Sequence, residues 1–164
     1  MKELQILVGN IGAGKTTYCK QKTREGYVII SKDDIRYSIG AGTYTFNFDY
    51  EPAINLIILM MVIDFMAIGV PVIIDETNMN KASRYYYLQF ANIYKYKKIA
   101  VIFKKLSMKE SVARRLNKNH GETTEEVWKE VWERFNFIYE APTKEEGFDI
   151  IENYSKEIDD CRTK

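Results

Sequence analysis

The feature that most constrains this chain is the octapeptide GNIGAGKT, which begins at Gly9. Gly9, Gly14, Lys15 and Thr16 satisfy the G-x-x-x-x-G-K-[ST] pattern, in which backbone N–H groups surround phosphate oxygens. The apolar run ILV before the octapeptide predicts the end of a buried strand, and a helix is expected to start near Lys15. A strand, a glycine-rich turn and a helix N-terminus together make an anion-binding site. The sequence therefore predicts a phosphate-binding loop.

The residue types within this loop predict its ligands. Lys15 can bridge the β- and γ-phosphates of ATP, and the Thr16 hydroxyl can ligate magnesium. Gly12 adds backbone freedom for a chain that must turn its N–H groups inward. ATP and Mg2+ are therefore the expected cofactors. The residues predicted to bind the nucleotide here are Gly9, Asn10, Ile11, Gly12, Ala13, Gly14, Lys15, Thr16 and Thr17.

Short apolar runs alternate with helix signals along the rest of the chain. Strands are predicted at residues 4–8, 27–30, 70–75 and 99–103, with a further edge strand at 148–153. Such alternation indicates an α/β fold with a mostly parallel sheet of four to five strands and helices on both faces. The 164 residues suffice for a single domain, 1–164, with a sizeable core.

Two acidic pairs follow predicted strands. Asp33 and Asp34 come after the second strand, and Asp75 and Glu76 come at the end of the third. Ligands of parallel α/β sheets bind beyond the carboxyl ends of the strands, so both pairs are expected near the loop. An acid in the position of Asp75 typically holds magnesium through water, although a capping or turn role also suits it. The sequence leaves open whether Asp75 or Glu76 faces the metal.

Asp33 and Arg36 form a second candidate constellation. A carboxylate at this place can face the γ-phosphate and accept a proton from an incoming hydroxyl. Arg36 is three residues further on, on the same face of a short helix, where it could hold an anionic acceptor through paired hydrogen bonds. A helix cap with a surface ion pair accounts for the pattern equally well.

Basic residues recur on a helix expected after the fourth strand. Ser107 and Glu110 form its capping box, and Arg114, Arg115 and Lys118 follow. Arginines here could belong to a lid that closes over a triphosphate, with Arg115 and Lys118 as further nucleotide contacts. A solvated helix face is the alternative.

Further along, Thr123 and Glu126 predict a second capping box. The helix that it starts carries an apolar stripe at helical spacing, and Trp128 and Trp132 are expected to pack in the core beside it.

An aromatic loop separates the acidic pair at residues 33–34 from the next helix. Tyr44, Phe46, Phe48 and Tyr50 alternate with polar residues. They could stack an acceptor base. Packing of the loop onto the body of the protein is the preferred interpretation.

The following helix, residues 53–68, is apolar nearly all round and is expected to be buried on most sides. Asn55, Asp64, Gly69 and Pro71 interrupt the long apolar run that contains it, so a soluble protein is expected rather than a membrane span.

Composition excludes several other classes of site. Cys19 and Cys161 are the only cysteines, far apart and without a CxxC pair, which indicates a reducing, cytoplasmic setting. His120 is the only histidine, so a zinc site or a Ser-His-Asp triad is not expected. A net charge of +1 gives the molecule no strong field toward nucleic acid or membrane.

Four segments together resemble polynucleotide 5′-hydroxyl kinases. GNIGAGKT, SKDDIR (31–36), IIDETN (73–78) and ARRLNKN (113–119) occur in the order seen in that family, across residues 6–135. The resemblance implies a P-loop kinase-like three-layer sandwich with a helical lid at about residues 107–125.

Roles follow from the same resemblance. Lys15 and Thr16 would bind ATP phosphates and magnesium, Asp33 would be the general base, and Arg36 would grip the 3′-phosphate of the acceptor. Asp75 matches the acid of a D-x-T-N signature, whereas some relatives place the acid immediately before Thr-Asn, where Glu76 stands. Arg115 fits the start of the lid pattern, and Lys118 or Asn119 replaces a later arginine.

Three hypotheses follow. The first is an ATP-dependent kinase for the 5′-hydroxyl of a DNA or RNA end. The second is a kinase for a nucleotide, a modified base or another small hydroxyl compound, which the near-zero net charge favours. The third is a nucleotide-binding regulator without acceptor phosphorylation. The sequence does not decide the oligomeric state.

Overall fold

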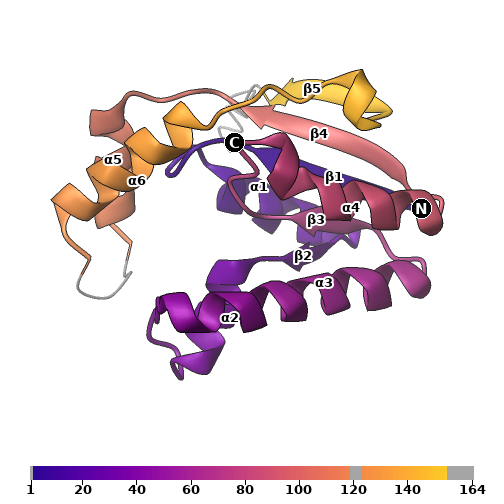
Figure 1. Ribbon diagram of the computed structural model, residues 1–164, viewed down its shortest axis with the longest axis horizontal. Helices are drawn as coiled ribbons and strands as arrows, with labels where there is room; N and C mark the ends of the chain where they lie inside the picture. Colours follow the sequence, from indigo (N-terminus) through magenta and orange to yellow (C-terminus); the bar gives the residue numbers. More distant parts are fainter. Residues whose placement is uncertain (1, 119–122, 155–164) are drawn as a thin grey trace, which may run out of the picture.

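Five strands form one sheet, in the order β2-β3-β1-β4-β5, in the computed structural model, which describes residues 2–118 and 123–154 (Figure 1). All neighbouring strands pair in parallel. The strands are β1 (Glu3–Val8), β2 (Val28–Ile30), β3 (Val72–Ile74), β4 (Lys97–Phe103) and β5 (Ile150–Tyr154). The predicted α/β fold with a parallel sheet of four to five strands is confirmed, the edge strand included.

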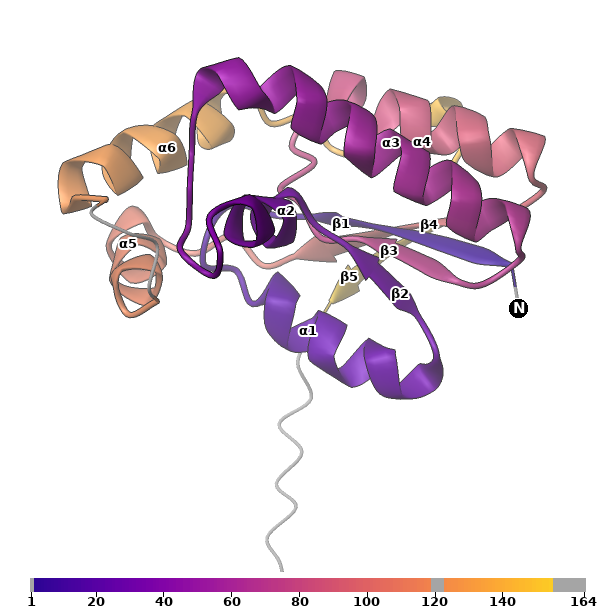
Figure 2. The same cartoon turned by 90° about the horizontal axis from the view of Figure 1, so that it is seen from below.

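Helices cover both faces of this sheet. Figure 2 shows α1 on one face and α3 with α4 on the other, while α2, α5 and α6 gather beyond the carboxyl ends of the strands. This is the predicted three-layer arrangement. The helices are α1 (Lys15–Lys22), α2 (Lys32–Ile39), α3 (Glu51–Ala67), α4 (Lys81–Ile93), α5 (Met108–Leu116) and α6 (Glu125–Phe137), with short 3-10 turns η1 (Thr23–Glu25), η2 (Phe48–Tyr50) and η3 (Lys144–Glu146).

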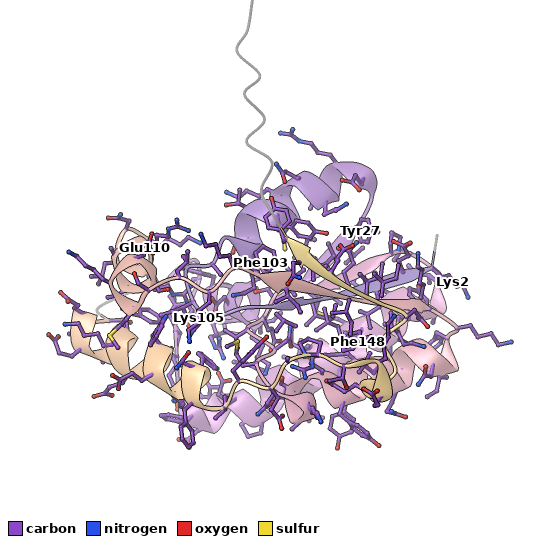
Figure 3. The ribbon with its side chains drawn as sticks, turned by 90° about the horizontal axis from the view of Figure 1, so that it is seen from above. Lys2, Tyr27, Phe103, Lys105, Glu110 and Phe148 are labelled. Carbon is purple, nitrogen blue, oxygen red and sulfur yellow. The ribbon has the colours of Figure 1, made fainter. Side chains whose placement is uncertain are left out.

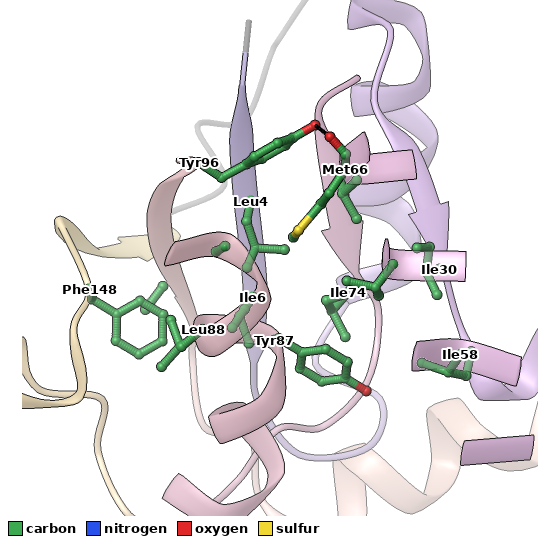
Figure 4. Close-up of a cluster of buried hydrophobic side chains, with 14 of the residues drawn as sticks. Leu4, Ile6, Ile30, Ile58, Met66, Ile74, Tyr87, Leu88, Tyr96 and Phe148 are labelled. Carbon is green, nitrogen blue, oxygen red and sulfur yellow. Dashed lines mark hydrogen bonds between the residues drawn. The ribbon is translucent and has the colours of Figure 1, made fainter. Parts of the chain in front are cut away.

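The central strand β1 explains why its sequence is apolar without interruption. Side chains of a strand alternate between the two faces of the sheet. Leu4, Ile6 and Val8 accordingly join the core cluster under α3 and α4, which Figure 4 shows, whereas Leu7 joins the cluster with Tyr18 of α1. Both faces are therefore dry, as the continuous apolar run predicts.

Helix α3 corrects one expectation. Only four of its side chains are buried, at a spacing of four residues, namely Ile54, Ile58, Val62 and Met66. Leu56 and Met60 on its outer side are both 63% exposed. The helix lies in the outer layer, so that a single stripe meets the sheet, and the prediction of burial on most sides is wrong. Phe48–Ala67 is also apolar and long enough to cross a membrane by composition alone, with 22% of that window buried.

Helix starts follow the predicted caps with one exception. Asn80 caps α4, and Ser107 with Glu110, which is labelled in Figure 3, forms the capping box of α5. At α6 the capping oxygen comes from Thr124, which accepts from the Val127 N–H, so the prediction for Thr123 is off by one residue. The positions of Asn119, His120 and Cys161 lie outside the described residues.

Candidate active site

The phosphate-binding loop has the predicted strand–turn–helix setting. Gly12 and Gly14 adopt positive φ angles of 71° and 99°, a conformation that other residues rarely take. A Cβ on Gly12 would also lie 2.8 Å from the Ser111 carbonyl oxygen of α5. Glycine at residue 12 is therefore required twice, for the turn and for the close approach of α5.

Lys15 curls back over its own loop. Its Nζ donates hydrogen bonds to the carbonyl oxygens of Gly9 and Asn10, at 2.7 and 2.9 Å. Burial, together with the nearby Arg115 cation, lowers the pKa of Lys15 to about 8, although the Asp75 carboxylate opposes that shift. The ammonium group thus stands at the mouth of the loop, where phosphates are expected.

Asp75 directly follows β3 and lies near the Thr16 hydroxyl of the loop. Burial raises the pKa of Asp75, while the nearby Lys15 ammonium, the buried Cys19 thiol and the Thr16 hydroxyl lower it. The thiol and the hydroxyl therefore lie close to this carboxylate. A threonine hydroxyl beside a strand-end aspartate is the donor set that holds magnesium in P-loop proteins.

The Glu76 side chain is paired with Lys32 and Tyr87 rather than with the phosphate-binding loop. Its Oε2 lies 3.3 Å from Nζ of Lys32, and its Oε1 accepts from the Tyr87 hydroxyl at 3.3 Å. Burial raises its pKa, which the Lys32 ammonium partly opposes. Of the two acids left open by the sequence, Asp75 is the one near enough to Thr16 for the hydroxyl to lower its pKa.

Asp33 lies near the start of α2, and two arginines hold it. Arg36 Nη1 donates to Oδ1 at 2.8 Å and Arg115 Nη2 donates to Oδ2 at 3.1 Å. The Tyr44 hydroxyl also donates to Oδ1, at 3.2 Å. Burial would raise the pKa of Asp33, but Arg115 and Arg36 outweigh it and the pKa falls below its ordinary value. Asp33 is therefore an ionised carboxylate.

Arg36 has a partner that the sequence did not reveal. Its Nε and Nη2 donate to the two carboxylate oxygens of Glu51, at 3.0 and 2.7 Å. Glu51 starts α3, fifteen residues further along the chain. A planar fork that binds two oxygens in this way could bind a phosphate similarly, and an anionic acceptor would have to share Arg36 with Glu51.

The lid arginines reach two different parts of the site. Arg114 Nη1 donates to the Gly12 carbonyl oxygen at 3.2 Å, whereas Arg115 crosses to Asp33. The Arg115 guanidinium also lies 4.5 Å from the centroid of the Trp128 ring, and within the described part of the chain its buried Nε has no hydrogen-bond partner. Lys118 is exposed but near enough to Lys15 to lower its pKa. Arg115 is thus the inward-facing member of the predicted set.

Helices α5 and α6 contact the phosphate-binding loop. Asn10 Nδ2 donates to the Trp132 carbonyl oxygen of α6 at 2.9 Å. Ile11 is buried in one apolar cluster with Val112 of α5 and Trp128 of α6. Trp128 is buried as predicted, and its ring additionally forms the cation–π contact with Arg115. The x positions of the motif therefore have a structural function, which the G-x-x-x-x-G-K-[ST] pattern does not specify.

The IIDETN segment (73–78) is hydrogen-bonded to β1 and to the first residue of the phosphate-binding loop. The Thr77 carbonyl accepts from Gly9 N at 3.0 Å, and the Asn78 side chain donates to the Leu7 carbonyl at 2.8 Å. Asn78 has a left-handed φ of 46°, and its own carbonyl accepts from Arg84 at 2.8 Å.

Arg84 connects the IIDETN segment to residues 140–146 near the C-terminal strand. Its side chain is 0% exposed and donates to both carboxylate oxygens of Glu146, each at 2.8 Å. Its Nη1 also donates to the Glu140 carbonyl at 3.1 Å. Sequence reasoning missed Arg84, because a single arginine in an amphipathic helix indicates a surface position.

The aromatic loop divides into inward and outward side chains. Tyr44 packs inward, with its ring centroid 5.3 Å from that of Tyr37. Phe46 and Tyr50 are each 48% exposed and Phe48 is 74% exposed. The preferred expectation, that these aromatics pack the loop onto the body, holds for Tyr44 and is wrong for Phe48.

Known proteins share this architecture. One chain of the Pnkp1/Rnl/Hen1 RNA repair complex superposes with a TM-score of 0.67 and 23% identity, over 84% of this chain and 45% of that one. Kti12 of Chaetomium thermophilum, solved with ADP-AlF3, gives 0.65 and 20% over 96% and 91% of the two chains. A gluconokinase from Sinorhizobium meliloti 1021 gives 0.55 and 16% over 93% and 82%.

These likenesses differ in what they cover. The chain spans less than half the length of the RNA repair chain that it matches. A comparison with curated proteins gave no match. Residues 4–142, most of the chain, match the AAA domain family. With this match, the parallel sheet and the phosphate-binding loop in its strand–turn–helix setting, the chain belongs to the AAA domain family and has a P-loop kinase-like fold.

Proposed function

We propose that this protein is an ATP-dependent kinase that transfers the γ-phosphate to a hydroxyl group, most specifically the 5′-hydroxyl of a DNA or RNA end. The observation that carries the proposal is the position of Asp33. It is an ionised carboxylate between Arg36 and Arg115, close enough to Lys15 to affect the pKa of that lysine. A protein that only binds nucleotide gains nothing from a carboxylate so placed.

The donor half of the site binds ATP. Backbone N–H groups of the loop and the Lys15 ammonium would hold the phosphates. Thr16 and Asp75 would hold Mg2+, and their oxygen donors suit this hard cation. Among the described residues no group of three or more His, Cys, Asp or Glu could hold a metal by itself, so phosphate oxygens and waters would complete the coordination. When bound, Mg2+ neutralises negative charge on the phosphates.

The acceptor half supplies the base. Asp33 would accept the proton of the attacking hydroxyl as its oxygen bonds to the γ-phosphorus and the bond to the β,γ-bridging oxygen breaks. Arg36 would hold a phosphate next to that hydroxyl. Arg115 would move between Asp33 and the transferring phosphoryl group. Its Nε, which has no hydrogen-bond partner among the described residues, offers a further donor.

The acceptor class rests on two kinds of support. The order of the four segments matches polynucleotide 5′-hydroxyl kinases, and a chain of an RNA repair complex shares the fold. A second candidate, a small hydroxyl compound, is favoured by the net charge of +1 and by the likeness to a gluconokinase. The polynucleotide end is preferred because Asp33 and Arg36 both come from the segment SKDDIR that carries the resemblance.

Labelled ATP offered with 5′-hydroxyl DNA, 5′-hydroxyl RNA and a panel of small hydroxyl compounds tests the proposal. Transfer to an oligonucleotide end is expected, with a KM that rises steeply with salt. Asp33→Asn should abolish transfer and leave ATP affinity nearly unchanged, whereas the control Asp49→Asn, at an exposed position, should behave as wild type. Transfer to a small compound alone would favour the second candidate, and ATP binding without transfer to any acceptor would favour a regulator.

A further inference from the structure

Two phenylalanines stand exposed at the rim of the acceptor half. Phe46 and Phe48, called the aromatic rim below, come from the loop between α2 and α3, and their ring centroids are 4.9 Å apart at nearly a right angle. Phe48 is 74% exposed, which leaves at least one face of its ring open to solvent. Exposed aromatic side chains that adjoin a polar site are suited to contact a ligand or a partner.

The aromatic rim is continuous with the proposed acceptor site. The Arg36 guanidinium lies 5.3 Å from the centroid of the Phe46 ring, and the same guanidinium donates to Asp33. A single side chain therefore separates the rim from the proposed base. A nucleotide adjoining the reacting end would extend over this distance.

The exposure of the rim does not come from a slack loop. The Gly42 N–H donates to the Tyr37 carbonyl at 2.8 Å, and the Tyr44 hydroxyl anchors the loop on Asp33. The turn is so tight that a Cβ on Gly40 would lie 2.0 Å from the Thr43 carbonyl oxygen. The loop is thus held in a form that points two aromatic rings outward.

We infer that the aromatic rim is a stacking site for the nucleobases of a single-stranded acceptor, next to its reacting end. The inference rests on the proposed function and deepens it, because it requires an acceptor that carries bases rather than a sugar or a polyol. Every base has a π-face, so stacking on phenylalanine tolerates any sequence. Since a net charge of +1 gives little long-range attraction, stacking would add to the affinity that local phosphate contacts provide.

Replacements of Phe48 separate stacking from general apolar contact. The dissociation constant of a short single-stranded 5′-hydroxyl oligonucleotide, labelled at its 3′ end, would be measured by fluorescence anisotropy with a non-hydrolysable ATP analogue present. Phe48→Ala should weaken binding about 10-fold, Phe48→Leu nearly as much, and Phe48→Tyr little. Tyr86→Ala removes another exposed aromatic side chain, 59% exposed, from α4 and should change nothing. Because Phe48 is exposed, these variants should unfold at the wild-type temperature.

A change in the acceptor gives the second arm of the test. The wild-type protein should bind an oligonucleotide with abasic residues next to its 5′ end about 10-fold more weakly than the intact oligonucleotide. The Phe48→Ala variant should bind the two oligonucleotides with equal affinity, because its stacking contact is already lost.

Each outcome decides between the two proposals. If the wild type transfers phosphate to oligonucleotides but neither Phe48→Ala nor the abasic acceptor alters binding, the stacking site is wrong and the kinase activity stands. If binding depends on Phe48 and on the bases while no phosphate is transferred, the stacking site stands and the kinase proposal is wrong. A wild-type protein that neither binds nor phosphorylates the oligonucleotide would overturn both.

Discussion

Arg115 of α5 donates a hydrogen bond of 3.1 Å to Asp33 of α2 and thereby joins the two helices. The contact is an ion pair between two partly buried side chains, 14% and 33% exposed. If Arg115 acts on the phosphoryl group, it must leave Asp33 or divide its donors between the two anions. ATP and Asp33 would then compete for one guanidinium, so that nucleotide binding would free the base.

Replacing Arg115 should affect catalysis more than binding. We expect Arg115→Ala to reduce kcat by about 10³-fold, as for other arginines that stabilise charge in phosphoryl transfer. Arg115 also lowers the pKa of Asp33, so its loss should move the acidic limb of the rate profile to higher pH. Steady-state kinetics across pH would measure both effects. Arg114→Ala, in which a neighbouring arginine on the same helix is lost, is the matched control, and equal effects from both variants would contradict the assignment.

The pKa of Lys15, about 8, predicts that ATP binding depends on pH. The charged ammonium should pair with phosphate, so the free protein above pH 8 must take up a proton as ATP binds. We expect uptake approaching one proton at pH 9 and almost none at pH 6, measured by titration calorimetry in buffers of different ionisation enthalpy. Lys15→Arg should abolish the uptake, because arginine does not titrate in this range. Equal uptake by both proteins would point to another group.

The same shift has a defined effect on stability. The folded pKa of Lys15 lies below its unfolded value, so between about pH 8 and 10.5 the unfolded chain binds more protons than the folded protein. The contribution of Lys15 to the free energy of unfolding therefore rises with pH across that window.

Cys19 should orient the proposed metal ligand. Its thiol lies close enough to Asp75 to lower the pKa of that carboxylate, and Cys19→Ser keeps a donor there, whereas Cys19→Ala removes it. We expect Cys19→Ala to raise the Mg2+ concentration for half-maximal ATP binding about 2- to 10-fold, from the usual free energy of one hydrogen bond. The serine variant should stay close to wild type. If serine and alanine shift the Mg2+ requirement equally, the effect comes from packing and not from the hydrogen bond.

Arg84 should be the most sensitive position for folding among those discussed. Arg84→Ala leaves Glu146 buried without its cation and leaves the carbonyls of Asn78 and Glu140 without a donor, which should cost about 3–5 kcal/mol. Denaturant unfolding followed by circular dichroism would measure the loss. Arg24→Ala, at an exposed position, should change the free energy of unfolding by less than about 0.5 kcal/mol. A small loss for Arg84→Ala would mean that water replaces its hydrogen bonds.

Local patterns predicted much of the fold and the convergence of the site. The strands, the loop, and the caps at Asn80 and Ser107 depend on residues close together in sequence, where spacing and side-chain chemistry decide the outcome. The approach of Asp33 and Asp75 to the loop followed from the rule that the carboxyl ends of parallel strands share one edge.

Long-range partners could not be predicted in the same way. The pairing of Arg36 with Glu51 depends on how α3 returns across α2, and the burial of Arg84 depends on a segment more than fifty residues away. The exposure of Leu56 and Met60 has a related cause. An apolar helix indicates that something covers it, but the pattern does not say how many neighbours the topology supplies.

The packing of Ile11 in one cluster with Val112 of α5 and Trp128 of α6 has a thermodynamic consequence. If α5 and α6 moved away from the phosphate-binding loop, their contacts with Ile11 and Asn10 would be strained or broken. Such an opening would therefore change the conformation of the loop. Nucleotide binding and closure of these helices would then be coupled. The free energy by which bound nucleotide favours closure equals the free energy by which closure favours nucleotide binding. A substitution that weakens the Ile11 contact should therefore lower nucleotide affinity and favour the open position of α5 and α6. ADP release and this opening would share one barrier.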